Sequence, residues 1–383
     1  MFRVLMIAVL LAAGAVRAAT PSDAPKVVFK DGASSSGWID FKVYKASNIF
    51  FPAKVNGRDV MVSLYGGPTN LDKSFAVSVG LSQTSGGNKE AAKTSGVTVI
   101  VGSLTLSDLT AAAVDVPPQF AKITGQPVPL VLGEEVFNRM VVDIDYAHHR
   151  LAFRDSADVS KPPRAVEVPL IELDGERVVP LSINGATPVQ FELELGNVSG
   201  PLLVIPSYAQ AHKLLEGHPT SQRLSGKFVE PVVTLDRLSF AGVDFPKVPI
   251  ALVPDAALPP ASITGGVGLP LLSHFRLIID YPNNRLFAIP NAEVPKPPFI
   301  KDRLGLVAAR EGDKLHVTFV APASPAEAAG FKKDDMIAAL NGKPVAAEPD
   351  LSILTLRFAD PGTRFTFTMT DGQVRRIQAT DFF

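Results

Sequence analysis

Residues 133–151 read GEEVFNRMVVDIDYAHHRL, and residues 268–286 read GLPLLSHFRLIIDYPNNRL. The two stretches share glycine, aspartate, tyrosine, arginine and leucine in one gapless register. Each pattern predicts a short turn, a strand, and a tight turn that leads into a second strand. The tight turns hold Ala147–His149 and Pro282–Asn284, so we expect the histidines there to be exposed turn residues and not ligands. The chain therefore contains an internal repeat.

The repeat extends upstream of these stretches. Asn56-Gly57 and Asn184-Gly185 each lie between β-rich runs, as is typical of β-hairpins. Each hairpin leads into a predicted strand, a glycine-containing corner and a short helical segment. The corners are Tyr65-Gly66-Gly67 and Glu194-Leu195-Gly196. We therefore expect two β lobes with the same order of elements, at residues 44–157 and 164–292.

This order of elements resembles the retropepsin-like aspartyl peptidase family. In that family each lobe has a hairpin, a corner that reads hydrophobic–Asp–Thr/Ser–Gly, and a later hydrophobic pair followed by glycine. Val131-Leu132-Gly133 and Gly266-Val267-Gly268 resemble that later element, which packs beneath the corner. The resemblance implies a mainly β fold, in which two tandem acid-protease lobes of one chain form a pseudo-dimer.

The two corners depart from the family pattern at the catalytic positions. The family's chemistry needs one aspartate from each lobe, and the two share a proton and activate a water. Tyr65 occupies that position in the first corner and Glu194 in the second. A tyrosine, with an ordinary pKa of about 10, is not a carboxylate base, so Glu194 is the candidate catalytic residue. The degenerate motif positions are Tyr65, Gly66, Gly67, Leu195 and Gly196.

Other acidic residues do not complete the catalytic pair in the sequence. Glu192 lies two residues before Glu194, roughly 7 Å away along a strand, which is too far to share a proton directly. We interpret Glu192 as a solvated charge on the strand face. Asp145 and Asp280 are expected to stabilise turns, and Asp72 is expected to cap a helix.

Residues 301–383 differ in character from the repeat. The run VAPASPAEAAGF at residues 320–331 and the sequence that follows it resemble a PDZ domain of the bacterial type, a small α+β barrel. We expect Ser324 to cap a short helix that ends at Gly330. A longer helix is predicted over residues 351–358.

The PDZ resemblance implies a peptide-binding groove. A peptide adds as a strand beside Leu304-Gly305-Leu306, and backbone amides there capture a C-terminal carboxylate. Arg303 either assists this capture or is a solvated surface charge. The expected partner is a peptide or protein C-terminus. The alternative is a domain that packs against the lobes and binds nothing.

Composition limits the classes of function. The 383 residues carry a net charge of −1, so no basic excess exists to bind nucleic acid. The absence of cysteine excludes disulfides, thiolate zinc sites and a cysteine nucleophile. With six scattered histidines, we expect no metal and no cofactor. The 33 prolines and 29 glycines favour short strands and turns.

Residues 1–18 have the pattern of a signal peptide. Arg3 precedes an apolar run at residues 5–15, and Val16 and Ala18 are small residues at the spacing that signal peptidase recognises. We expect cleavage after Ala18 and export to the periplasm or the cell exterior, without a membrane anchor thereafter.

Three functions are compatible with these features. The first is a peptide-binding relative of aspartyl peptidases that has lost proteolysis. The second is an active endopeptidase in which Glu194 works with an unorthodox partner, or in which two chains of a dimer each supply Glu194. The third is a scaffold whose lobes serve assembly and whose PDZ domain binds partners.

Overall fold

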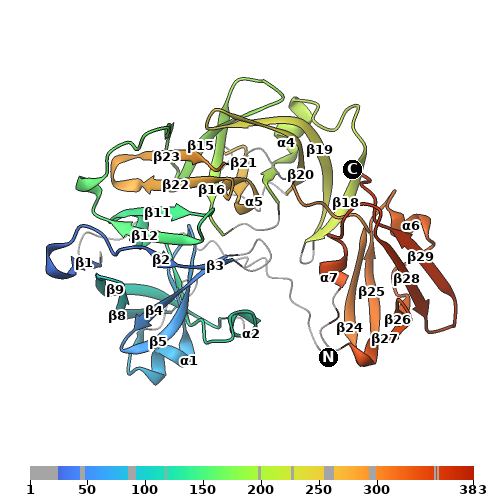
Figure 1. The fold of residues 1–383 in the computed structure, drawn as a ribbon, viewed down its shortest axis with the longest axis horizontal. Coiled ribbons are helices and arrows are strands. Elements are labelled where there is room, and N and C mark those ends of the chain that lie inside the picture. The colour runs from blue at the N-terminus through green and yellow to red at the C-terminus, as the bar shows by residue number, and fades with distance from the viewer. Residues whose placement is uncertain are drawn as a thin grey trace.

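Short strands joined by tight turns make up most of this chain, as its composition predicts. A computed structural model describes residues 25–43, 48–84, 92–116, 119–196, 200–225, 228–253, 263–292, 299–348, 351 and 353–383. Within these residues the protein is mainly β, with short helices and four sheets, several of them barrel-like (Figure 1). The predicted signal peptide lies outside the described residues.

The first sheet comes from the first copy of the repeat and from the segment before it. Its described strands follow the order β1-β9-β6-β10-β5-β4-β8-β7, with β3 paired to β4. They are β1 (Lys26–Phe29), β3 (Lys42–Val43), β4 (Ile49–Val55), β5 (Arg58–Leu64), β6 (Asn70–Asp72), β7 (Gln83–Thr84), β8 (Lys93–Val101), β9 (Leu104–Val114) and β10 (Leu130–Leu132). The α-helices of this part are α1 (Lys73–Ser78), α2 (Gln119–Thr124) and α3 (Glu134–Phe137). We call this part the first lobe.

The second sheet comes from the second copy, and we call this part the second lobe. Its described strands follow the order β14-β15-β16-β21-β17-β20-β19-β18. They are β14 (Ile171–Leu173), β15 (Glu176–Ile183), β16 (Val189–Glu194), β17 (Leu202–Val204), β18 (Thr220–Ser225), β19 (Phe228–Phe240), β20 (Val243–Leu252) and β21 (Gly265–Gly268). The α-helices are α4 (Pro206–Ala211) and α5 (Leu269–Leu272).

The two sheets have the same internal topology. In each, the second hairpin strand (β5 or β16) pairs in parallel with a later short strand (β10 or β21). That short strand pairs antiparallel with the strand after the corner (β6 or β17). This third strand runs parallel to the second strand of a long hairpin (β9 or β20). The repeat read from the sequence is therefore a duplicated structural unit.

The hairpin asparagines make matching contacts in the two lobes. Asn56 donates its N–H to the Thr98 carbonyl (2.9 Å) and accepts from the Thr98 N–H through Oδ1 (3.0 Å). Asn184 makes the same pair of bonds with Arg237, at 2.9 and 3.1 Å. Both asparagines have positive φ, 43° and 49°, as the predicted tight turns require. The Asn-Gly signal therefore fixes both a turn and the strand beside it.

A third sheet joins the two lobes, in the order β13-β23-β22-β11-β12-β2 (Figure 1). Its strands are β2 (Ile39–Asp40), β11 (Val141–Asp145), β12 (Arg150–Arg154), β13 (Val166–Pro169), β22 (Phe275–Asp280) and β23 (Arg285–Pro290). At its centre β11 and β22 run antiparallel, with Asp143 opposite Ile278. These two residues are equivalent positions of the repeat, so the lobes meet about a local twofold axis. One continuous hydrophobic core contains residues from both lobes.

The repeated aspartates hold the turns of this sheet, as the sequence predicts. Asp145 Oδ2 accepts from Arg150 Nε at 3.0 Å, and Asp280 Oδ2 accepts from Arg285 Nε at 2.8 Å. Each aspartate also accepts from a backbone N–H within its own turn. Both are buried and hydrogen-bonded to their turns, so neither is available as a second catalytic acid.

The fourth sheet forms the C-terminal part, with its own hydrophobic core. Its order is β24-β25-β26-β28-β29, with β27 paired to β26. The strands are β24 (Leu306–Glu311), β25 (Lys314–Val320), β26 (Met336–Leu340), β27 (Lys343–Pro344), β28 (Arg364–Met369) and β29 (Val374–Gln378), and the α-helices are α6 (Pro325–Ala328) and α7 (Ile353–Leu356). Ser324 caps α6 by accepting from the Glu327 N–H at 3.2 Å, as predicted.

Helix α7 is shorter than the sequence suggests. We predicted a helix over residues 351–358, whereas the described helix spans Ile353–Leu356. Arg357 and Phe358 form a turn, so the predicted helix extended too far at its C-terminal end.

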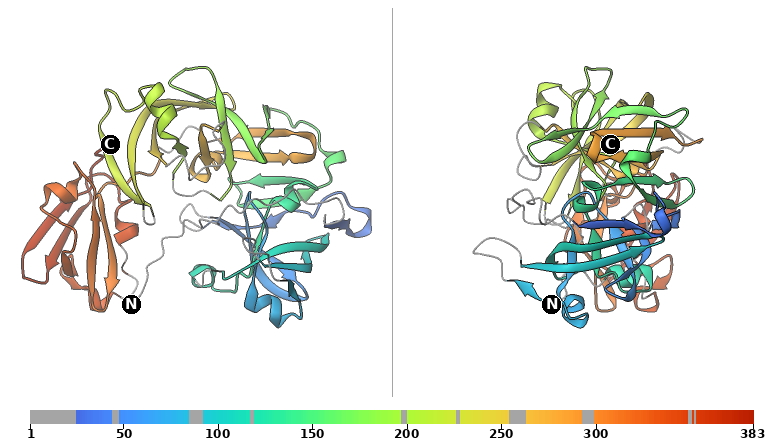
Figure 2. Two further views of the ribbon diagram at one scale, coloured as in Figure 1. Left: turned by 180° about the vertical axis from the view of Figure 1, so that it is seen from behind. Right: turned by 90° about the vertical axis from the view of Figure 1, so that its left-hand side faces the viewer.

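The C-terminal part lies against the second lobe, on the side away from the first lobe's sheet (Figure 2). Ser221 Oγ on β18 donates to the Pro322 carbonyl at 2.5 Å, and Thr234 Oγ1 on β19 donates to the Phe383 carbonyl at 2.9 Å. The Phe383 side chain packs against a small buried apolar cluster of the second lobe. Polar and apolar contacts together therefore fix this domain to the lobe.

Candidate functional site

The two glycine-containing corners meet where the lobes face each other. A Cβ atom added to Gly67 would lie 2.5 Å from Cε1 of Tyr65, and one added to Gly196 would lie 2.2 Å from Cδ2 of the same ring. Opposite edges of the Tyr65 ring therefore face the two corners. No other residue fits at Gly67 or Gly196 without moving the ring, because real Cβ atoms do not approach so closely. The space between the corners is filled by an aromatic side chain.

The segment after β10 holds the first corner from beneath. Gly133 donates its N–H to Thr69 Oγ1 at 2.9 Å, and the next residue, Glu134, donates its N–H to the Gly67 carbonyl at 2.8 Å. A Cβ on Gly133 would lie 2.1 Å from the Gly67 oxygen, so glycine is required there. Thr69 also donates to Glu135 Oε2 at 2.5 Å. The corner is therefore rigid.

The charges of four glutamates act on the Tyr65 hydroxyl. Burial and, after it, the negative charge of these glutamates together raise the pKa of Tyr65 to about 12. These are Glu194, Glu192, Glu176 and Glu134. Tyr65 is consequently a neutral phenol at physiological pH and does not serve as a base.

Glu192 was wrongly interpreted as a solvated strand-face charge. Burial, and the neighbouring charges of Glu194 and Glu176, hold the pKa of Glu192 well above its usual range. The sequence placed Glu192 and Glu194 on one strand face correctly, but it contained no sign of Glu176 or Glu134. Those two reach the cluster from β15 and α3, and only the tertiary fold brings them there. For Glu134, burial and then its acidic neighbours raise the pKa to about 7.

Glu194 packs along its own sheet. A Cβ on Gly266 would lie 1.8 Å from Glu194 Oε1, so the glutamate side chain lies over the parallel strand β21. The negative charge of Glu194 acts on the carboxylate of Glu192, in the same lobe, and raises the pKa of Glu192. From the first lobe the equivalent position contributes the Tyr65 ring. The arrangement therefore provides a carboxyl pair within one lobe and an aromatic ring between the lobes.

A second candidate site lies at the edge of the fourth sheet. Strand β24 ends the sheet order, so in the described residues one of its edges is free to receive another strand, and α7 lies beside it. Leu304 and Leu306 are fully buried, and Gly305 has φ 67°. Leu304 and Gly305 lie in the loop that leads into β24, and Leu306 is the first residue of that strand. Their role in peptide binding stays a prediction.

The loop amides at this edge already have an acceptor. Asp302 Oδ1 accepts from the Leu304 N–H at 3.0 Å and from the Gly305 N–H at 2.8 Å. Asp302 Oδ2 lies 3.4 Å from Arg357 Nε, and both side chains are about one-tenth exposed, 11% and 8%. Sequence reasoning missed Asp302, although its place immediately before the loop was a visible signal.

Arg303 is neither solvated nor unpaired. Its Nε donates to Asp381 Oδ1 at 2.7 Å, its Nη1 donates to the Ala359 carbonyl at 3.1 Å, and its side chain is 11% exposed. The interpretation of Arg303 as a solvated charge is therefore wrong. Assistance to a ligand carboxylate stays a prediction, and it would require the pair with Asp381 to open.

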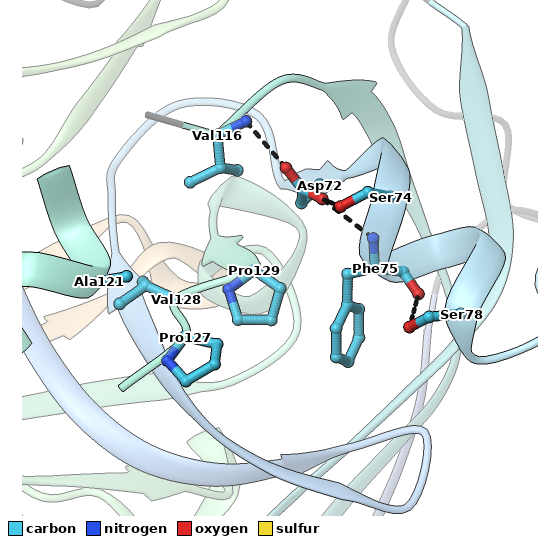
Figure 3. A pocket seen from close by; sticks show the side chains of 9 residues that line it. All are labelled: Asp72, Ser74, Phe75, Ser78, Val116, Ala121, Pro127, Val128 and Pro129. Atoms are coloured by element: carbon cyan, nitrogen blue, oxygen red, sulfur yellow. Dashed lines mark hydrogen bonds between the residues drawn. The ribbon is translucent and has the colours of Figure 1, made fainter. Parts of the chain in front are cut away.

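A shallow hollow on the first lobe has a volume of about 300 Å³ (Figure 3). Its lining residues are Asp72, Ser74, Phe75, Ser78, Val116, Ala121, Pro127, Val128 and Pro129. Asp72 caps α1, as predicted, by accepting from the Phe75 N–H at 2.9 Å, and it also accepts from the Val116 N–H at 3.1 Å. The one charged side chain in this lining is thus engaged by the backbone around it.

The described part of the chain contains neither a candidate metal site nor a candidate membrane-spanning helix. Within it, no three histidine, aspartate or glutamate side chains gather in an arrangement that could hold a metal ion. Within the same residues, no helix combines the length and apolar character needed to span a bilayer. The candidate sites are thus the region between the corners and the β24 edge.

Comparison with known families identifies the C-terminal part. The family model of the PDZ domain matches residues 302–378. The predicted PDZ domain is therefore present, and the fourth sheet with α6 and α7 is its structure. The search of curated proteins returned no match for the chain.

The contact of the Tyr65 ring with Gly196 predicts the effect of a single methyl group. Gly196→Ala should lower the free energy of unfolding by about 1–3 kcal/mol, because the added Cβ overlaps the ring. In the Tyr65→Ala background the same change should lower the free energy of unfolding by less than half as much. In the Tyr65→Phe background the decrease should equal that in the wild type, because the ring is still present. Urea denaturation of the six proteins measures this. Equal costs in all three backgrounds would contradict the contact.

The buried glutamates predict that stability falls as pH rises. Glu134 has a folded-state pKa of about 7 against 4.5 for the unfolded chain, so the folded state binds more protons between these values. The contribution of Glu134 to stability is therefore fully present below pH 4.5 and is lost as the pH rises through about 7. After allowance for solvent screening, Glu134→Gln should recover on the order of 1 kcal/mol at pH 8 and little at pH 5. Denaturation at both pH values, with exposed Glu172→Gln as control, tests this.

Proposed function

We propose that this protein is an exported, peptide-binding relative of the retropepsin-like aspartyl peptidases that has lost proteolysis. The single observation that carries the proposal is the Tyr65 ring, which fills the space between the corners. In a working enzyme of that family, two aspartates hold a water in this space. A ring whose two edges touch Gly67 and Gly196 leaves no room for it.

The duplicated topology supports the assignment of the lobes. Each lobe has the hairpin, the glycine corner and the later hydrophobic-glycine strand in the expected order, and β10 and β21 pair with the corner strands in parallel. The symmetric pairing of β11 with β22 supports a pseudo-dimer within one chain. We propose lobe limits of 44–157 and 164–292, joined to the PDZ domain.

The electrostatics of the corners argue against peptide hydrolysis. An aspartyl dyad needs two carboxyl groups that share one proton across the lobe interface. Here the first lobe supplies a phenol whose pKa is about 12, so it neither accepts a proton nor activates water at physiological pH. Tyr65, at the matching position of the first lobe, supplies no carboxyl group.

Peptide binding is assigned to the PDZ domain. The free edge of β24 offers backbone N–H and C=O groups, and a peptide that adds as a further strand satisfies them. Helix α7 lies along the same edge and provides the other side of the groove. We propose peptides or unfolded protein segments as the ligands. The signal-peptide pattern of residues 1–18 supports an exported location.

One observation favours a second candidate function, that of an active endopeptidase. Glu192 and Glu194 influence each other's charge, and Glu192 has a raised pKa. A protonated Glu192 beside an ionised Glu194 is the combination that acid–base hydrolysis uses. In this mechanism Glu194 is the base and Glu192 is its unorthodox partner.

Incubation with an unstructured peptide library from pH 3 to 8, followed by mass spectrometry, separates the two functions. We expect no cleavage by the wild type or by Glu194→Gln. A variant that combines Tyr65→Asp, Gly66→Thr, Glu194→Asp and Leu195→Thr restores both corner motifs and should cleave, because the corners and their supports are already in place. The same variant with Glu194→Asn in place of Glu194→Asp is its matched control and should be inactive.

Cleavage by the wild type that both Glu194→Gln and Glu192→Gln abolish would contradict the loss of proteolysis and establish the endopeptidase. Failure of the restored variant, if it folds with wild-type stability, would argue that the lobes serve assembly alone. The PDZ domain would then account for all binding.

A further inference from the structure

The carboxylate of Asp302 occupies the position in the PDZ loop where a ligand's terminal carboxylate is expected. Its Oδ1 accepts from two successive loop amides, those of Leu304 and Gly305, at 3.0 and 2.8 Å. Its Oδ2 faces Arg357 at 3.4 Å. Oδ1 thus takes the two loop amides that would otherwise receive a peptide C-terminus, and Oδ2 lies in an ion pair with Arg357.

The burial of this pair makes it a stable part of the domain. The side chains of Asp302 and Arg357 are 11% and 8% exposed, so the interaction is poorly screened by water. Removal of Asp302 from the loop would leave the Arg357 cation buried without its partner, which is costly. A ligand carboxylate must therefore displace Asp302 completely or approach it as a like charge.

The cations around the loop are already neutralised by acids. Arg303 pairs with Asp381 at 2.7 Å, and Arg357 pairs with Asp302. Arg223 of the second lobe, which acts electrostatically on Arg357, pairs with Glu230 at 2.7 Å. Each of these three arginines thus has an acidic partner, and Asp381 is shared with Lys301, whose Nζ lies 3.6 Å from it. These ion pairs reduce the attraction that the loop offers to a further carboxylate.

We propose that Asp302 sets the specificity of this groove, which takes segments from the interior of a polypeptide and not free C-termini. This inference rests on the proposed peptide-binding function. The internal carboxylate satisfies the loop, while the β24 edge stays available for strand addition, which uses only ligand backbone. A segment from the interior of an unfolded protein fits this groove because it brings no terminal charge to the loop.

The test uses the full chain and pairs of synthetic peptides. Binders are first selected from random twelve-residue peptides displayed in two ways, with a free C-terminus and between flanking linkers. Each selected sequence is then synthesised as the free acid and as the C-terminal amide. Fluorescence anisotropy gives the dissociation constants for the wild type and for Asp302→Ala. Asp335→Ala is the matched control, because Asp335 pairs with Arg375 elsewhere in the same domain.

For the wild type we expect the two peptide forms to bind within about twofold of each other. For Asp302→Ala we expect the free acid to bind about tenfold or more tightly than the amide, because a carboxylate then gains charge-assisted bonds to the vacated amides. The Asp335→Ala control should behave as the wild type does.

A tenfold preference of the wild type for the free acid would overturn the inference, and this comparison stands even if Asp302→Ala fails to fold. Equal binding of both forms by a folded Asp302→Ala would overturn the role of Asp302. Absence of binding by every peptide form would contradict the proposed peptide-binding function itself, and the inference with it.

Discussion

The contact of the Tyr65 ring with glycines from both lobes is the constraint on which the centre of this protein depends. Gly67 and Gly196 each approach the ring so closely that a methyl group would overlap it. The ring belongs to the first lobe and Gly196 to the second, so this contact lies across the lobe interface. The charges of four glutamates act on this ring, whose phenol is neutral at physiological pH. The packing of the ring between the corners and the neutral state of its hydroxyl therefore both support the proposed loss of hydrolysis.

The duplicated lobes form a frame whose joining contacts lie away from the corners. The symmetric β11–β22 pairing and the continuous core hold the lobes together independently of the corners, and Asn56 and Asn184 make matching contacts within their own lobes. A frame of this kind can lose its chemistry and keep its fold, because the stabilising contacts lie elsewhere. The PDZ domain is fixed to the second lobe through Ser221 and Thr234.

The parts of this structure that were predictable from the sequence are those specified by nearby residues. Asn56-Gly57 makes its turn, Asp72 caps its helix, and the aspartates of the repeat hold arginines five positions away. The failures involve residues whose surroundings come from distant strands. Glu192 is half-buried and lies near Glu176 of the neighbouring strand β15, and Asp302 meets Arg357 only once the domain has folded. A single sequence shows which charges exist, and only the fold shows which charges meet.

The central claim, that no catalytic water site exists between the corners, is tested most directly with a transition-state analogue of peptide hydrolysis. Such a peptide carries a hydroxyl group that replaces the water between two catalytic carboxyls. Isothermal titration calorimetry of the wild-type protein should show no binding that depends on Glu194. Stoichiometric binding that Glu194→Gln abolishes would contradict the account, because it would show that the space filled by Tyr65 opens to a substrate.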